Sequence, residues 1–123
     1  MSRTALVLLA AILVGLVLVA GAHGQAPHRR YHPVTIEQLA AGMVPWPYAQ
    51  LVGRVRMVRA EQDGDLHITL TGRTAVAILE CIPELPCRKP PLGARIRAWG
   101  IPREDKEHGW WELHPLLGWN VQP

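Results

Sequence analysis

The chain has 123 residues, which is enough for one small domain and excludes an assembly of several domains. Its formal net charge is +3, from 13 basic and 10 acidic residues, so charge alone permits but does not require contact with nucleic acid or anionic lipid. Apolar residues make up 49% of the chain, but many of them lie in one N-terminal run, which leaves a smaller core for the domain.

The N-terminal run covers residues 5–22, ALVLLAAILVGLVLVAGA, and contains no charge. Arg3 precedes it, and small residues close it at Ala20 and Ala22, a pattern typical of a secretory signal peptide. The run is also long enough to span a bilayer. We therefore expect residues 1–22 to be a signal peptide or an N-terminal anchor. The chain is then periplasmic or secreted, or held at the inner membrane by residues 5–22.

The next segment, residues 23–33, is polar and interrupted by proline, which favours a flexible spacer ahead of a domain at residues 34–123. That domain opens with VTIEQLAAG, in which Thr35 and Gln38 have the spacing of a capping box. Gly42 supplies a left-handed stop. The pattern predicts a short helix from Ile36 to Ala41.

From residue 50 onward the apolar residues alternate with polar ones, which indicates β-strands. Five strands are predicted, in the segments LVGRVRMV, LHITLT, TAVAILECI, ARIRAWGI and WWELH, the last ended by Pro115. Five strands are too few for a good sandwich, but they can close into a small barrel that leaves no exposed edge. We predict an all-β fold: a five-stranded OB-like barrel with a short N-terminal helix.

Cys81 and Cys87 are the two cysteines of the chain, separated by IPELP, whose two prolines bend the chain. An exported protein favours their pairing, so we expect a disulfide that closes a short loop. Two free thiols are the alternative.

The segments DGDLHITL and WWELHP, with GARIRAWG between them, resemble OB-fold proteins of unassigned function in bacteria. Those proteins carry a DGD-x-H strand and an E-[LI]-H-P strand in this order, and the resemblance covers residues 50–116. It implies the barrel fold and no particular activity, because OB barrels serve many functions. The helix usual between the third and fourth strands is replaced here by a proline-rich loop.

Arginines of the first and fourth predicted strands are expected on one outer face of the barrel. Guanidinium groups that share a face repel one another unless anions are present. The face is therefore either a solvated surface with cross-strand ion pairs or a stripe that binds an anionic polymer, such as single-stranded nucleic acid or polysaccharide. The candidate ligand-binding residues are Arg54, Arg56, Arg95, Arg97, Trp99 and Trp110.

His67, Glu112 and His114 are candidate metal ligands, because imidazole and carboxylate suit zinc or copper. Glu112 and His114 are two apart on a strand and share a side, whereas the place of His67 depends on packing. The alternative is structural: His67 braces a turn with Asp65, and His114 fixes the end of a strand. We expect Trp111 and Leu113 to fill the barrel, and Glu112 and His114 to face water.

Catalysis has little support, because no nucleophile is paired with a base and the sole serine, Ser2, lies in the signal segment. We expect a protein that is not an enzyme and uses no cofactor. The expected function is an exported OB-fold binding module for an anionic polymer. The alternatives are a structural or interaction protein of the envelope and a His/Glu metal-binding protein. We expect a monomer that contacts a membrane if the N-terminal segment is retained.

Overall fold

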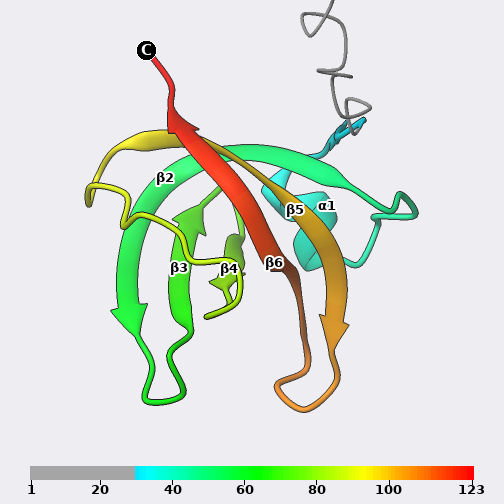
Figure 1. Ribbon diagram of the computed structural model, residues 1–123. Helices are drawn as coiled ribbons and strands as arrows, with labels where there is room; N and C mark the ends of the chain where they lie inside the picture. Colours follow the sequence, from blue (N-terminus) through cyan, green and yellow to red (C-terminus); the bar gives the residue numbers. More distant parts are fainter. Residues whose placement is uncertain (1–29) are drawn as a thin grey trace, which may run out of the picture.

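The computed structural model describes residues 30–123 (Figure 1), so the predicted signal peptide or anchor lies outside the described residues. Within residues 30–123, no helix is sufficiently long and apolar to cross a membrane. The elements, in chain order, are β1 (His32–Pro33), α1 (Ile36–Ala40), β2 (Ala49–Ala60), β3 (Leu66–Thr71), β4 (Val76–Cys81), β5 (Arg95–Asp105) and β6 (Trp110–Val121). β1 falls in the segment expected to be a spacer, and it pairs in parallel with the start of β2.

The strands β2 to β6 close into a barrel, as predicted. Their order is β2-β3-β4-β6-β5, and β5 pairs back with β2 to complete the ring. The β4–β6 contact is parallel, and the other contacts of the ring are antiparallel. This mixed closure of five strands gives the small OB-like barrel expected from the sequence.

Every second residue of a strand points into the barrel, and most of these residues are apolar. This arrangement explains why alternating apolar residues in the sequence predict the barrel. The fully buried members of this interior include Leu51, Ile68, Leu70, Leu79, Ile96 and Leu113. Each such side chain stabilises the fold by roughly 1.5–3 kcal/mol relative to an exposed one. The two sides of each strand therefore differ, and polar side chains are left for the outer face.

The helix α1 has the predicted capping box: Thr35 accepts from the Gln38 amide at 3.0 Å, and Gln38 accepts from the Thr35 amide at 2.8 Å. α1 packs against β2, β4 and β6, and it buries Ile36 and Leu39. A Cβ atom on Gly53 would lie 2.5 Å from Ile36 Cδ1. A larger residue at position 53 would therefore force the Ile36 side chain or its surroundings to shift.

The prediction that Pro115 ends the last strand is wrong, because β6 continues to Val121. The β5–β6 register is irregular at this point: Gly100 lies opposite Leu116, and Pro102 lies opposite Leu113. A proline, which has no N–H group to donate, is tolerated where the ladder is interrupted. The strand can therefore pass through Pro115.

Cys81 and Cys87 form the predicted disulfide, with their Cα atoms 5.9 Å apart. The bridge ties the end of β4 to the loop that leads to β5. Such a bridge is typical of proteins from oxidising compartments.

Candidate functional site

A group of ionisable side chains lies on the outer side of three neighbouring strands. The register pairs His67 of β3 with Glu80 of β4, and the parallel β4–β6 ladder brings Glu80 beside His114. Glu112, two residues before His114, lies on the same side of β6. We call this group the histidine–carboxylate cluster; it consists of Asp65, His67, Glu80, Glu112 and His114.

The expectation that Glu112 and His114 face water is wrong. Glu112 is fully buried, the side chain of His114 is 18% exposed, and Leu113 between them lies in the core as predicted. Alternation therefore gives the correct side of β6 but not the solvent exposure. Arg103 Nη2 donates to Glu112 Oε1 at 2.7 Å, and Trp110 Nε1 donates to Glu112 Oε2 at 3.1 Å, so side chains of the β5–β6 hairpin cover this carboxylate.

Glu80 lies between the two histidines, and each of its oxygens faces one of them. Glu80 Oε1 is 3.3 Å from His67 Nε2, and Glu80 Oε2 is 3.1 Å from His114 Nδ1. Glu112 Oε1 is 3.3 Å from the same His114 nitrogen. His114 Nδ1 is nevertheless buried without a hydrogen-bond partner, because these close contacts lack hydrogen-bond geometry. A buried polar nitrogen of this kind calls for an explanation.

The spacing of these atoms fits a metal ion. Bond lengths near 2.0–2.1 Å place two ligands of a tetrahedral zinc ion about 3.3 Å apart. The contacts of 3.1 and 3.3 Å between His114 Nδ1 and the two carboxylates are close to that separation. Two sets of three residues have ligand atoms within 4.8 Å of one another and share Glu80: Asp65, His67, Glu80 and Glu80, Glu112, His114.

Asp65 adds a third carboxyl group to the cluster. A hydrogen bond with the Glu80 side chain, supported by desolvation and by the negative charge of Glu80, raises the pKa of Asp65 to about 6. Asp65 is therefore protonated in the metal-free protein at mildly acidic pH, with its proton directed at the Glu80 side chain. A cation that binds here would displace that proton.

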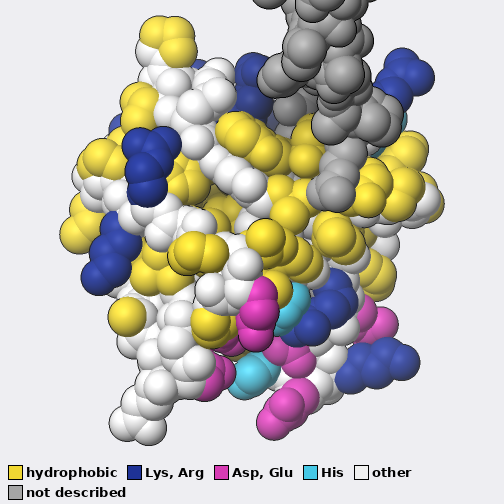
Figure 2. Space-filling view, viewed as in Figure 1, with side chains coloured by type: hydrophobic (Ala, Val, Ile, Leu, Met, Phe, Trp, Pro, Cys, Tyr) yellow, Lys and Arg dark blue, Asp and Glu magenta, His cyan; other side chains and the backbone are white. Residues whose placement is uncertain are grey.

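A cavity of about 640 Å³ opens beside the cluster, and His67 and Glu80 contribute to its wall. It lies between the β2–β3 and β5–β6 turns, which are at one end of the barrel in Figure 1. OB barrels commonly bind ligands with these two loops. In Figure 2 acidic and histidine side chains gather in the lower part of the visible face. The cluster thus has access to the usual ligand-binding end of the fold.

His108 stands at the rim of this cavity on the β5–β6 turn. Its Nδ1 atom lies 2.6 Å from Asp105 Oδ2, and its ring stacks on Trp110 with centroids 4.6 Å apart. The hydrogen bond with Asp105 raises the pKa of His108. Trp110, predicted on the arginine face, therefore belongs to the surroundings of the cluster.

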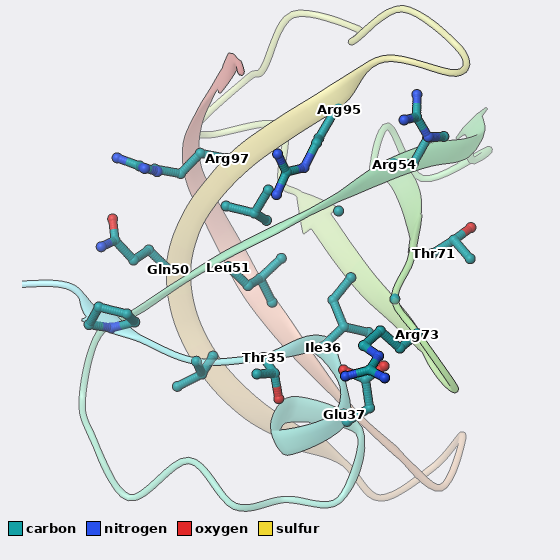
Figure 3. A pocket seen from close by; sticks show the side chains of 15 residues that line it. Thr35, Ile36, Glu37, Gln50, Leu51, Arg54, Thr71, Arg73, Arg95 and Arg97 are labelled. Carbon is teal, nitrogen blue, oxygen red and sulfur yellow. The ribbon is translucent and has the colours of Figure 1, made fainter. Parts of the chain in front are cut away.

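A second feature, which we call the arginine groove, lies over β2 and β5 and has a volume of about 580 Å³. Arg54 stands directly opposite Arg95 in the β2–β5 ladder, and Arg97 follows two residues later. Arg73, from the β3–β4 connection, completes the set. Figure 3 shows the first three along one side and Arg73 across from them, near Glu37. Four arginines therefore line the groove; in Figure 3 the guanidinium group of Arg95 points over it, whereas those of Arg54 and Arg97 point away from its centre.

The groove contains three of the six residues predicted to bind ligand: Arg54, Arg95 and Arg97. Arg56 is exposed on β2 but does not line it. Trp99 lines a different hollow beside Trp119, and Trp110 lies near the cluster. Glu112 does not line the groove, and it bonds Arg103.

Sequence reasoning missed Glu80, the central member of the cluster, and Arg73 of the groove. The signal for Glu80 was present: a carboxylate in the otherwise apolar stretch AVAILEC is a charge in a predicted central strand. A buried charge needs partners or a metal. Arg73 gave no such signal, because its place depends on how the β3–β4 turn sits against α1.

A comparison with protein-family models finds no match to this chain, and a comparison with curated proteins finds none either. What the chain binds must therefore be inferred from the chemistry of the cluster and of the groove.

Proposed function

We propose that this chain is an exported OB-like binding protein that holds a divalent transition-metal ion, of the zinc class, in its histidine–carboxylate cluster. One observation carries the proposal. His114 Nδ1 is buried, has no hydrogen-bond partner, and lies 3.1 Å and 3.3 Å from oxygens of two carboxylates. Imidazole nitrogen and carboxylate oxygen are the ligand types that zinc takes beside thiolate.

The proposed ligands are His114 Nδ1, Glu80 Oε2 and Glu112 Oε1. Glu80 and Glu112 are both buried, at 8% and 0% exposure. Two adjacent buried carboxylates repel each other and lose hydration, so a divalent cation between them would offset both costs. The burial of two negative charges beside His114 is therefore stronger support for a metal ion than the presence of three possible ligand atoms.

The remaining neighbours suit the role of outer partners that orient the ligands. Arg103 and Trp110 donate to the two oxygens of Glu112, and His67 lies 3.3 Å from the second oxygen of Glu80. Such outer contacts fix the orientation of ligating carboxylates, and their loss typically weakens metal affinity by about 10–100-fold. Asp65, whose pKa is raised to about 6, would release its proton when the ion binds.

The competing explanation is a metal-free ion pair, in which a protonated His114 lies between Glu80 and Glu112. The two explanations differ in one measurable property, the metal content of the purified chain. We expect one zinc ion per chain after exposure to zinc and removal of loosely bound metal. His114→Ala should lose the ion. His108→Ala, which removes an exposed histidine at the cavity rim, should keep it.

The test is elemental analysis of the full chain and both variants, with circular dichroism to verify that each is folded. Isothermal titration with zinc adds the affinity, which should fall at least about tenfold in Glu112→Gln. Zinc-free wild-type protein, or equal zinc content in His114→Ala, would overturn the proposal and favour the ion pair.

The binding of an anionic polymer on the arginine face is a second candidate function, and one observation favours it. Arg54 lies directly opposite Arg95, and like charges at facing positions of a sheet are destabilising unless an anion offsets them. Retention of the chain on an anionic matrix, lost as salt is raised, would test this candidate. It concerns a different surface and is independent of the metal.

A further inference from the structure

The four arginines of the groove have no carboxylate partners among the described residues. The arginine–carboxylate ion pairs of residues 30–123 are Arg59–Glu61 and Arg103–Glu112, and both lie outside the groove. Arg54 Nη1 donates to the Gly93 carbonyl at 2.6 Å, which fixes the direction of that side chain. The other three guanidinium groups are free to receive a ligand.

One carboxylate, Glu37, lines the same groove, and it is already engaged. Its Oε1 atom accepts from the Thr74 amide at 2.8 Å, and this backbone hydrogen bond lowers the pKa of Glu37. Glu37 thus remains charged and stays tied to the β3–β4 connection. Four arginines and one glutamate line the groove, so its lining carries a net charge of +3 (4 − 1).

The arginines of the groove are spread along its length and are not clustered at one place. Arg95 and Arg97 are alternate residues of β5, so their Cα atoms are separated by about 6.6 Å along the strand. Arg54 faces Arg95 from β2, and Arg73 stands on the opposite side. A row of charges beside a channel suits anionic groups that repeat along a chain better than it suits one small anion.

No aromatic side chain of residues 30–123 lines the groove. Trp99, which continues the Arg95–Arg97 row, packs against Tyr31 with ring centroids 6.3 Å apart. A Cβ atom on Gly118 would lie 2.5 Å from Trp99 Cζ2, so the ring rests directly on that glycine. Proteins that bind single strands gain roughly 1–3 kcal/mol per base from aromatic stacking. The groove lacks that platform.

Three uncharged polar residues line the groove: Thr35, whose hydroxyl accepts from the Gln38 amide, and Gln50 and Thr71, which can exchange hydrogen bonds with hydroxyl groups. We propose that the arginine groove binds an acidic polysaccharide, recognised by its carboxylate or sulfate groups and its hydroxyls, in preference to single-stranded nucleic acid. This inference rests on the proposed binding of an anionic polymer and names its chemical class.

The experiment measures binding of the full chain to four probes at low salt: a heparin oligosaccharide, an oligogalacturonate, an uncharged dextran oligosaccharide, and single-stranded DNA of matched charge. We expect both acidic oligosaccharides to bind at least about tenfold more tightly than the DNA, and the dextran not to bind. The sulfate and carboxylate arms show which anionic group is preferred. Affinity should fall steeply with salt.

Two variants locate the site. Arg95→Ala should weaken binding of the preferred oligosaccharide about tenfold, because it removes a charge-assisted contact. Arg56→Ala removes another exposed strand arginine, which lies outside the groove, and the affinity of this variant should stay within about twofold of wild type. Equal losses in the two variants would overturn the assignment to the groove.

The outcomes also distinguish the binding of an acidic polysaccharide from the more general binding of an anionic polymer, on which this inference rests. DNA that binds as tightly as the acidic oligosaccharides would overturn the polysaccharide assignment and leave anionic-polymer binding intact. Failure of every anionic probe at low salt would overturn both. Thermal melting of each variant shows whether a loss of binding reflects a loss of folding.

Discussion

The Nδ1 atom of His114 lies 3.1 Å from Oε2 of Glu80 without a hydrogen bond between them. The parallel β4–β6 ladder brings the two residues together. Its residue pairs are Ile78–Glu112 and Leu79–Leu113, and Glu80 and His114 are the next residue along each strand. This ladder joins two strands that are not consecutive in the sequence. A site built here is therefore supported by rigid strands, which hold ligands more accurately than loops do.

Zinc should stabilise the chain against heat if it binds the cluster. A ligand present at about 100 times its dissociation constant stabilises the native state by about 2.7 kcal/mol. For a domain of this size such a gain raises the melting temperature by on the order of 10 °C. Calorimetry of the full chain with and without zinc measures the shift. It should vanish in His114→Ala and persist in His108→Ala; a shift of equal size in both variants would contradict a site at His114.

The stability of the metal-free chain should depend on the protonation of Asp65. Its pKa is raised from an ordinary 3.8 to about 6 in the folded protein, mainly by the hydrogen bond with Glu80. The folded state therefore binds this proton more tightly than the unfolded state. The resulting stabilisation is full below pH 3.8 and is lost as pH rises through about 6.

Asp65→Asn isolates this contribution, since an amide can donate to Glu80 at every pH. We expect the melting temperature of wild type, relative to the variant, to rise as pH falls from 7 to 5. Parallel pH profiles would show that the pKa of Asp65 is not raised in the folded protein.

The fold was predictable because the alternation of apolar residues and the capping box at Thr35 are local signals. The burial of Glu112 was not, since alternation tells which side of a strand a residue takes and not what covers that side. Here Arg103 and Trp110 cover it from the same hairpin. No local pattern indicates such a cover.

The arginine groove and the histidine–carboxylate cluster also differ in how far the sequence predicts them. Arg54, Arg95 and Arg97 could be grouped from the sequence, because an OB barrel pairs its first and fourth strands. The link between His67 and His114 required Glu80, and the contact of Glu80 with His114 depends on a parallel register that no sequence pattern fixes. Ladder register between distant strands is the physical information missing from the sequence.

Gly53→Ala should destabilise the barrel, because the added Cβ would lie 2.5 Å from Ile36 Cδ1 and 3.0 Å from Leu70 Cβ. Overpacking of this kind typically costs about 1–3 kcal/mol. Urea denaturation gives the free energy of unfolding. Ile36→Val removes the clashing methyl group, so the double variant should lose less than the sum of the single losses. Additive losses would show that α1 does not press on Gly53.

Loss of the disulfide should destabilise the chain without abolishing its fold. Cys81 and Cys87 are six positions apart, and closure of so short a loop stabilises by about 2 kcal/mol in the chain-entropy view. We expect replacement of both cysteines by alanine to lower the free energy of unfolding by that amount, measured by urea denaturation. Reduction of wild type with dithiothreitol should lower it similarly, since both treatments open the same loop. If neither treatment changes stability, the loop between β4 and β5 must be held by its other contacts, such as the bond from Trp119 Nε1 to the Arg88 carbonyl.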